Sequence, residues 1–269
     1  MPPAPPAQLN TLKRWLLRPT AANKMPLLTA IVLTLNEAAH LPDCLASLAF
    51  ADAVLVFDSF SSDRTTEIAG AAGARVVQHA FTDYAAQRNA ALDAVQSDWV
   101  FFVDADERVP AQLAQEVRSA TMQPDVAAWW VPRHNYILGR LTLHAGWFPD
   151  YQLRLLRPDC VRYDSSRPVH ELALVTGASA QLAQPLIHLN YATIREFVSK
   201  QRVYAELAAA GMWQAGKRAR AHQPLTMALR QFYWRFVTLA GWRMGWHGAL
   251  LALLMAHSEW LSYRSLRRR

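Results

Sequence analysis

The segment LTAIVLTLNE, residues 28–37, starts with apolar and β-branched residues and ends in an amide and a carboxylate. A continuous apolar run of this kind is typical of a strand that is buried on both faces of a parallel sheet. Similar runs recur as far as Val103, and stretches with helical spacing separate them. The expected strands are 28–35, 53–57, 75–78 and 99–103, and the expected helices are 38–50, 63–72, 84–95 and 110–121. This alternation predicts an α/β fold, with a mostly parallel sheet flanked by helices.

The pattern changes after Met122. Residues 127–137, 151–156 and 172–175 are expected to form strands, and from Ile194 the spacing is helical to the end of the chain. One apolar stripe of this helical part consists of Leu225, Leu229, Phe232, Phe236, Leu239 and Ala240. We therefore expect a flexible N-terminal tail at residues 1–26, an α/β domain at 27–192 and a helical extension at 193–269.

The composition limits the class of protein. The chain has 269 residues, of which 52% are hydrophobic and 18% charged, so it suits one large domain and is not a disordered chain. Cys44 and Cys160 belong to no CxxC or Cys/His cluster, which argues against a disulfide framework or a structural zinc site. No apolar run approaches the ~20 residues of a spanning helix, and the Pro-rich start is unlike a secretion signal. We expect a cytoplasmic location.

The positive charge is concentrated at the C-terminal end. Residues 217–269 hold ten basic residues and one acid, whereas residues 1–216 hold 18 basic and 20 acidic residues. Five of the ten tryptophans lie in this segment or just before it: Trp213, Trp234, Trp242, Trp246 and Trp260. Interleaved Trp, Arg and Leu suit the interface of an anionic membrane, here the inner face of the plasma membrane. The alternative is a helical subdomain with core tryptophans and solvated arginines. No nucleic-acid partner is expected, because no reading motif accompanies the charge.

Polar residues follow three of the expected strands. They are Asn36 and Glu37 after the first, Asp58 to Asp63 after the second, and Asp104, Asp106 and Glu107 after the fourth. Ligands of parallel sheets bind at the carboxyl ends of the strands. Carboxylates at positions i and i+2 of an extended chain point to the same side, and such a pair suits Mg²⁺ or Mn²⁺ and a phosphate. The alternative is that these residues form turns and helix caps.

The nature of the ligand follows from the motifs near these strand ends. Gln87, Arg88 and Asn89 lie on a nearby expected helix, and together with the acidic strand ends they suit a sugar nucleotide. A nicotinamide cofactor does not fit, because no GxGxxG follows the first strand, and a kinase-type P-loop is also missing from the sequence.

These motifs, in this order, resemble the family 2 glycosyltransferases of GT-A fold. The matching segments are IVLTLNE (31–37), DSFSSDRT (58–65), QRN (87–89), VDADE (103–107), GWFPDYQLRLLRP (146–158) and VHE (169–171). The last two segments resemble those of the bacterial branch of the family that includes lipopolysaccharide core β-glucosyltransferases. The resemblance covers residues 27–175 and makes the α/β domain a GT-A domain. Phe60 stands where the family usually has a glycine, and we expect it to reshape the base pocket.

The resemblance implies roles for individual residues. Glu37 and Asp58 would hold the ribose and nucleobase of the donor, with Asn36 and Asp63 in the same nucleotide-binding set. Arg88 would approach the nucleotide or its phosphates. Asp104 would contact the ribose or the metal, and Asp106 would ligate the metal that bridges the diphosphate. The implied co-substrate is a nucleoside-diphosphate sugar, in the first place a UDP-sugar, and the implied cofactor is Mg²⁺ or Mn²⁺.

The resemblance also implies an inverting single displacement onto a glycolipid or lipopolysaccharide-core acceptor. The base must lie across the sugar from the diphosphate, so Glu171 is the first choice and Asp150 the second. His170 would complete the metal shell or orient Glu171. Arg154 and Arg157 would meet an anionic acceptor or lie on a solvated strand face, and both interpretations stay open.

Two other functions remain as alternatives at this point. A nucleotidyltransferase shares the layered sheet and the acidic metal site, but it would carry a Gly-rich, basic loop where this chain reads LNEAAH (35–40). A non-catalytic membrane adaptor is opposed by the intact Asp104, Asp106 and Glu171.

Overall fold

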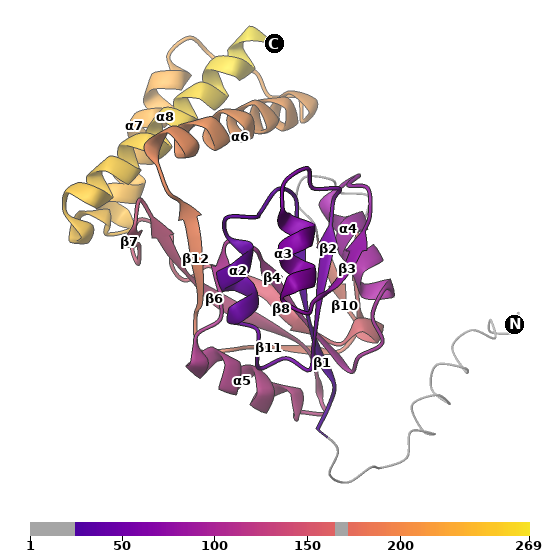
Figure 1. Ribbon diagram of the computed structural model, residues 1–269. Coiled ribbons are helices and arrows are strands. Elements are labelled where there is room, and N and C mark those ends of the chain that lie inside the picture. Colours follow the sequence, from indigo (N-terminus) through magenta and orange to yellow (C-terminus); the bar gives the residue numbers. More distant parts are fainter. Residues whose placement is uncertain (1–24, 165–171) are drawn as a thin grey trace, which may run out of the picture.

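The computed structural model describes residues 25–164 and 172–269, and its overall shape is shown in Figure 1. The first half alternates strands and helices as expected. The strands are β1 (Leu28–Thr34), β2 (Ala53–Asp58), β3 (Arg75–Gln78) and β4 (Trp99–Asp104). The helices are α2 (Leu41–Ala46), α3 (Thr65–Ala71), α4 (Tyr84–Asp93) and α5 (Ala111–Thr121). The α/β fold is confirmed, and the strands β3, β2, β1 and β4 run parallel in that order.

The second half extends the same sheet with antiparallel and parallel strands. These strands are β5 (Glu107–Arg108), β6 (Val126–Ile137), β7 (Arg140–Leu141), β8 (Tyr151–Leu156), β11 (Ala178–Gln181) and β12 (Leu186–Tyr191). A short turn η1 (Pro158–Cys160) precedes a separate ribbon of β9 (Val161–Tyr163) and β10 (Ala173–Val175). The main sheet therefore continues from β4 through β8, β6 and β12 to β5. Strands β5, β7, β9, β11 and β12 were not expected. Strands β5, β11 and β12 pair with partners far away in the chain, whereas β7 is two residues long and pairs with the adjacent end of β6.

The buried core explains why the first strand is apolar throughout. Alternate side chains of a strand point to opposite faces of the sheet. Ala30 and Val32 of β1 belong to the cluster under α2 and α5, whereas Ile31 belongs to the cluster on the other face, under α4. All three are fully buried, so the strand must be apolar at odd and even positions alike.

The strand register places the polar strand ends at one edge of the sheet. Thr34 of β1 pairs with Asp58 of β2, and Leu33 pairs with Asp104 of β4. The loops after these three strands therefore leave the sheet side by side, as the parallel arrangement predicts.

The C-terminal part is helical. It consists of α6 (Ile194–Gln214), α7 (Gln223–Tyr233), a π-helical turn η2 (Trp234–Thr238), a 3₁₀ turn η3 (Gly241–Met244) and α8 (Trp246–Arg268). Figure 1 shows these helices gathered beyond the end of the sheet that β12 approaches. A small core of Ile137, Tyr191, Phe197 and Leu251 joins the ends of β6 and β12 to α6 and α8. Across the described ranges, we find no helix that is both long and apolar enough to cross a bilayer.

Candidate active site

The loops after β1 and β2 are tied together by their own polar side chains. The Asn36 side-chain oxygen accepts a hydrogen bond from the Ser62 amide (2.8 Å). The backbone N–H of Asn36 donates to the Ser61 hydroxyl (2.8 Å). Asp63 accepts from the Ala38 amide (3.1 Å). Asn36 has φ 58°, a left-handed conformation that asparagine tolerates better than most residues. Asn36 and Asp63 therefore fix the shape of this edge.

Asp58 lies beneath these loops and is fully buried. Its carboxylate accepts hydrogen bonds from the Thr34 hydroxyl (2.9 Å), the Ser61 amide (2.9 Å) and the Gln78 amide group (3.3 Å). Burial opposes ionisation, but these hydrogen bonds outweigh it and lower the pKa of Asp58. The protein itself occupies the oxygens of Asp58, so its place in the structure is to hold the two loops.

The two acids after β4 have different neighbours. Residues 105–106 form a turn, so the chain is not extended between Asp104 and Asp106, and the side chains do not share one side. Asp104 contacts the guanidinium of Arg154, and Asp106 lines a cavity. The expectation that these two carboxylates point the same way rested on an extended chain, and the turn removes it.

Arg154 connects two acids inside the protein. Its side chain on β8 is 2% exposed and contacts both carboxylate oxygens of Asp104 and the Oε1 of Glu107 (2.5 Å). Burial opposes ionisation of Asp104, but the charge and hydrogen bonds of Arg154, with the charge of Arg88, hold the pKa of Asp104 far below its usual range. Arg154 therefore neither faces an acceptor site nor lies on a solvated strand face, the two positions expected for it.

Arg157 and Arg88 also pack within the protein. Arg157 is half-buried: its guanidinium lies 4.6 Å from the centre of the Trp99 ring and donates to backbone carbonyls, among them that of Val126. Arg88, on α4, lies over the Phe102 ring (4.9 Å), and its Nη2 is 3.9 Å from the Oδ1 of Asp104.

The charge network continues to Asp150. Arg133 on β6 lies 3.4 Å from Glu107 and donates two hydrogen bonds to the Oδ2 of Asp150 (2.9 and 2.6 Å). Asn135 and Gln152 donate to the same carboxylate (3.1 and 2.9 Å). Burial raises the pKa of Asp150, but the charge of Arg133 and these hydrogen bonds outweigh it, so the pKa is lowered. Asp150 is thus held as a carboxylate within the network.

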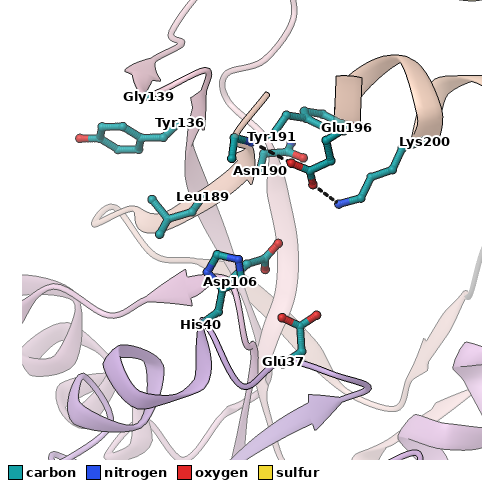
Figure 2. Close-up of a pocket in the computed structure, with 11 residues that line it drawn as sticks. Glu37, His40, Asp106, Tyr136, Gly139, Leu189, Asn190, Tyr191, Glu196 and Lys200 are labelled. Atoms are coloured by element: carbon teal, nitrogen blue, oxygen red, sulfur yellow. Dashed lines mark hydrogen bonds and ion pairs between the residues drawn. The ribbon is translucent and has the colours of Figure 1, made fainter. Parts of the chain in front are cut away.

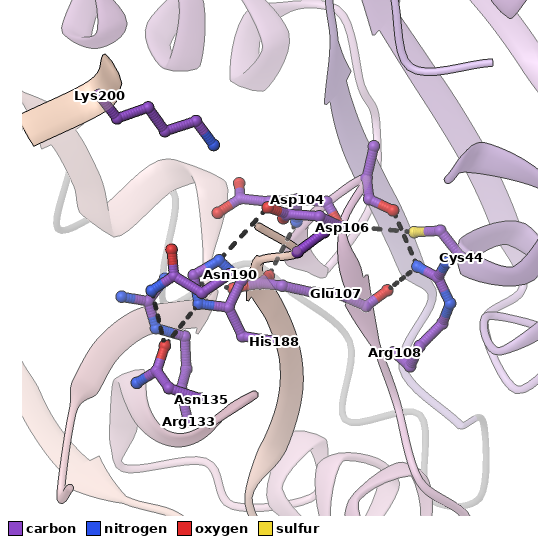
Figure 3. A network of polar contacts seen from close by, with 12 residues as sticks. Cys44, Asp104, Asp106, Glu107, Arg108, Arg133, Asn135, His188, Asn190 and Lys200 are labelled. Atoms are coloured by element: carbon purple, nitrogen blue, oxygen red, sulfur yellow. Dashed lines mark hydrogen bonds and ion pairs between the residues drawn. The ribbon is translucent and has the colours of Figure 1, made fainter. Parts of the chain in front are cut away.

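His188 of β12 is the neighbour of Asp106 (Figure 3). Its Nε2 lies 3.4 Å from the Oδ2 of Asp106, and its Nδ1 lies 2.7 Å from the Oδ1 of Asn135. The amide nitrogen of Asn135 donates to the Trp147 carbonyl and to Asp150, so its oxygen must accept from His188. The Nδ1 of His188 therefore carries a hydrogen, and in the neutral ring the lone pair of Nε2 faces the carboxylate.

A cavity of about 470 Å³ lies between the strand ends and α6 (Figure 2). Glu37 and His40 line one side, next to Asp106. Its other lining residues come from β6, β12, α6 and the segments next to them: Tyr136, Gly139, Leu189, Asn190, Tyr191, Ala192, Glu196 and Lys200. Burial and then the charge of Asp106 raise the pKa of Glu37. Two acids from separate strand ends therefore meet in one hollow.

His170 and Glu171 lie outside the described residues. Within the described ranges, no group of three or more His, Cys, Asp or Glu side chains is placed to hold a metal ion.

A family model described as glycosyl transferase family 2 matches residues 29–174, which is more than half of the chain. This chain belongs to glycosyltransferase family 2. The family resemblance, the GT-A fold and the transferase activity are thereby confirmed, and the match does not favour a nucleotidyltransferase. The acidic strand ends at Glu37, Asp58, Asp104 and Asp106 all lie within the matched segment.

Relatives of this glycosyltransferase include proteins with assigned names. It is 29% identical to the lipopolysaccharide core biosynthesis glycosyltransferase LpsC of Rhizobium meliloti, over 86% of this chain and 87% of that one. Among solved structures, S. aureus TarS (residues 1–349) is 15% identical with a TM-score of 0.46, covering 90% of this chain and 89% of that one. Glucosyl-3-phosphoglycerate synthase of Mycobacterium tuberculosis is 18% identical with a TM-score of 0.44, covering 67% and 76%.

Sequence reasoning missed several residues of this glycosyltransferase that line the cavity or adjoin it. His188, Tyr191 and Lys200 lie beyond the matched segment, on β12 and α6. The alternation of LIHLNY (186–191) is a strand signal, and it would have placed His188 and Asn190 on opposite sides from Leu189. Nothing local in the sequence marks Lys200.

Proposed function

We propose that this glycosyltransferase moves a sugar from a nucleoside-diphosphate sugar, in the first place a UDP-sugar, to a lipid-linked or lipopolysaccharide-core acceptor. The observation that carries the proposal is the cavity where Glu37, after β1, meets Asp106, after β4. The similarity to LpsC over most of both chains supports the acceptor class. We assign an inverting single displacement, in which an acceptor hydroxyl attacks as the nucleoside diphosphate leaves from the opposite face of the sugar.

The residues at the sheet edge would bind the donor. In this proposal Glu37 contacts the ribose or base, and Asn36, Asp58 and Asp63 hold the loops that shape the nucleoside site. Arg88 and Asp104 lie next to each other at the end of β4, where they are suited to orient the phosphates and the ribose. Asp104 would act as an ionised carboxylate, since Arg154 favours its charged form.

A divalent cation fits the pair formed by Asp106 and His188. A carboxylate oxygen and an imidazole lone pair 3.4 Å apart repel each other unless a proton or a metal ion lies between them. When bound there, the cation would neutralise charge on the departing diphosphate, an effect worth several kcal/mol. The nitrogen ligand favours Mn²⁺ over Mg²⁺, because Mg²⁺ prefers oxygen ligands.

Glu171 is the proposed base, with His170 to orient it or to complete the metal shell. A positioned base contributes roughly 10²- to 10⁴-fold. Asp150 is less suited to that step, because Arg133, Asn135 and Gln152 occupy its oxygens and the pKa of the carboxyl is lowered. We propose instead that Asp150 keeps Arg133 and Asn135 in place.

The first test is Asp106→Asn. The variant keeps the size of the side chain but loses the charge that would hold the cation, so we expect transfer to fall by a factor on the order of 100 or more. The measurement is sugar transfer or donor hydrolysis with UDP-, GDP- and ADP-sugars, with and without Mn²⁺. The melting temperature should stay near that of the wild type.

Asp125→Asn is the matched control for this test. Asp125 is exposed and immediately precedes β6, whose other end reaches the cavity at Tyr136. Transfer by Asp125→Asn should equal that of the wild type. Near-normal turnover by Asp106→Asn would contradict the assigned role, and transfer by the wild type from none of these donors would contradict the proposed function.

We further propose that the C-terminal helices hold the enzyme on an anionic membrane at the cytoplasmic side. Leu225 and Leu229 of the apolar stripe are exposed on α7, and so are Tyr233, Trp242 (55%) and Trp246 (66%). Arginines accompany these rings: Arg243 lies 5.5 Å from the Trp242 ring and Arg140 lies 5.2 Å from the Trp246 ring. Aromatic rings beside cations suit the headgroup depth of anionic lipid.

The membrane proposal predicts that Trp242→Ser with Trp246→Ser weakens binding to vesicles of phosphatidylglycerol and phosphatidylcholine. Losing two interfacial rings should reduce the bound fraction at least tenfold, because each ring buries 150–250 Å² at about 25 cal/mol per Å² when fully covered. Co-sedimentation measures the bound fraction. Phe81→Ser is the control, since Phe81 is also exposed but precedes α4, far from these helices in the chain. Equal sedimentation of the double variant and the wild type would refute the proposal.

A further inference from the structure

Helix α6 brings one cation to the cavity wall. Lys200 faces the cavity from α6, on the side opposite Glu37 and Asp106 (Figure 2). Among the lining residues that the structure describes, it is the one Lys or Arg, and it stands against three acids: Glu37, Asp106 and Glu196. Figure 3 shows its side chain extending from the helix towards the loop that carries Asp106.

The position of Lys200 is set by the start of the helix. The Thr193 hydroxyl accepts from the Glu196 amide (3.1 Å), and the Glu196 carboxylate accepts from the Ala192 amide (2.9 Å). Thr193 is the N-cap of α6, and Glu196 reaches back to the residue before it, so the pair resembles a capping box and fixes the first turn of the helix. The free oxygen of Glu196 then holds the Nζ of Lys200 at 2.9 Å, one turn further along. The capped first turn of α6 and the Glu196 carboxylate therefore place the ammonium group at the cavity wall.

The Glu196–Lys200 pair is a half-exposed i, i+4 ion pair, and what distinguishes it is its place at the cavity wall. An exposed pair at i and i+4 needs no cavity beside it and contributes about 0.3–0.5 kcal/mol. Lys200 instead packs over the Tyr191 ring (5.4 Å) at the wall of a hollow lined by carboxylates. Burial acts to lower the pKa of Lys200, but its hydrogen bond to Glu196 and the charges of Glu196 and Asp106 outweigh this and raise it, so the group is a cation at neutral pH.

We propose that Lys200 is a phosphate-binding residue of this cavity, placed by α6 to donate hydrogen bonds to a phosphate group of the bound substrate. An anion entering here would be repelled by Glu37 and Asp106, and a fixed ammonium group on the opposite wall offsets that repulsion. The phosphate belongs either to the donor diphosphate or to a phosphorylated acceptor. The inference rests on the proposed function, since it deepens the account of the same site.

The experiment compares Lys200→Ala with the wild type by isothermal titration. Pyrophosphate and UDP, each with Mn²⁺, report the donor side, and inorganic phosphate added to protein saturated with UDP and Mn²⁺ reports the acceptor side. A charge-assisted hydrogen bond is lost, so we expect affinity for one of these probes to fall roughly 10- to 100-fold. Lys200→Arg should recover part of it. The probe for which the affinity falls identifies the source of the phosphate.

Two further variants separate binding from helix stability. Lys217→Ala removes a lysine in the loop after α6 and should leave every affinity unchanged. Glu196→Gln removes the charge of Glu196 but keeps a side-chain oxygen that can accept a hydrogen bond from Lys200, so it should keep the affinity that Lys200→Ala loses. Unchanged affinities in Lys200→Ala, or an equal loss in Glu196→Gln, would overturn the inference while leaving the proposed function intact. Phosphate binding through Lys200 with no sugar transfer from any donor would overturn the proposed function and leave the inference about Lys200 intact.

Discussion

Arg154 shows how a single buried cation organises the acidic edge of the sheet. It contacts Asp104 at the end of β4 and Glu107 three residues later, so both ends of the turn between them are held by one guanidinium. The Asp104 amide also donates to Glu107 (2.8 Å). Removing one partner of such a buried group leaves an uncompensated charge, at a cost of about 3–5 kcal/mol. The turn that presents Asp106 to the cavity is therefore rigid because of residues that do not line the cavity.

Phe60 stands at a position where the family usually has a glycine, and its backbone conformation is one that favours glycine. Its φ is 59°, in the left-handed region, and its side chain is 58% exposed. A non-glycine residue in this region costs about 1–2 kcal/mol, whereas glycine adopts it freely. Phe60 thus sits strained on the surface of the loop after β2.

Replacing Phe60 with glycine should therefore stabilise the protein. Glycine also loses about 0.5–1 kcal/mol of chain entropy on folding, so we expect a net gain of about 0.5–1 kcal/mol in Phe60→Gly. Phe60→Ala removes the same ring but keeps the strain, and it should show no gain. Urea unfolding measures the free energy of unfolding of both variants. Equal values for Phe60→Gly and Phe60→Ala would contradict the explanation by backbone strain.

At the scale of elements, α8 docks on η3 through a glycine-to-glycine contact. A Cβ on Gly248, near the start of α8, would overlap the backbone carbonyl of Gly241. No flexible side chain can move aside there, so the helix itself would have to shift. The close approach lets α8 pack against α6 and α7 while His247 stays buried next to Thr142.

This contact predicts opposite effects for two Gly→Ala substitutions in long helices. Gly248→Ala should destabilise the protein by about 1–3 kcal/mol through overpacking. Gly211→Ala, inside α6, meets nothing within 4 Å and should stabilise the helix by up to about 1 kcal/mol. Chemical unfolding measures the free energy of unfolding, which should fall in Gly248→Ala and rise in Gly211→Ala. A stable Gly248→Ala variant would mean that α8 can shift away from η3 at little cost.

For the molecule as a whole, the parts that sequence could predict are those set by local patterns. The buried parallel strands, the helices between them and the polar strand ends at Glu37, Asp58 and Asp104 follow from periodicity and the rules for parallel sheets. The pairing of β12 with β5 and β6 does not, because strand register depends on partners far apart in sequence. His188 reaches Asp106 only through that pairing. Arg154 could not be placed either, since its burial depends on two acids from another part of the chain.

The far wall of the cavity has a consequence for how the protein is made. The family match ends at residue 174, and α6 begins at Ile194, so the sheet edge with Glu37 and Asp106 is synthesised well before the wall with Lys200. A growing chain on the ribosome thus has the sheet edge before it has the wall that α6 adds to the cavity. Until α6 has been translated and has docked, the ammonium group of Lys200 does not stand opposite Glu37 and Asp106.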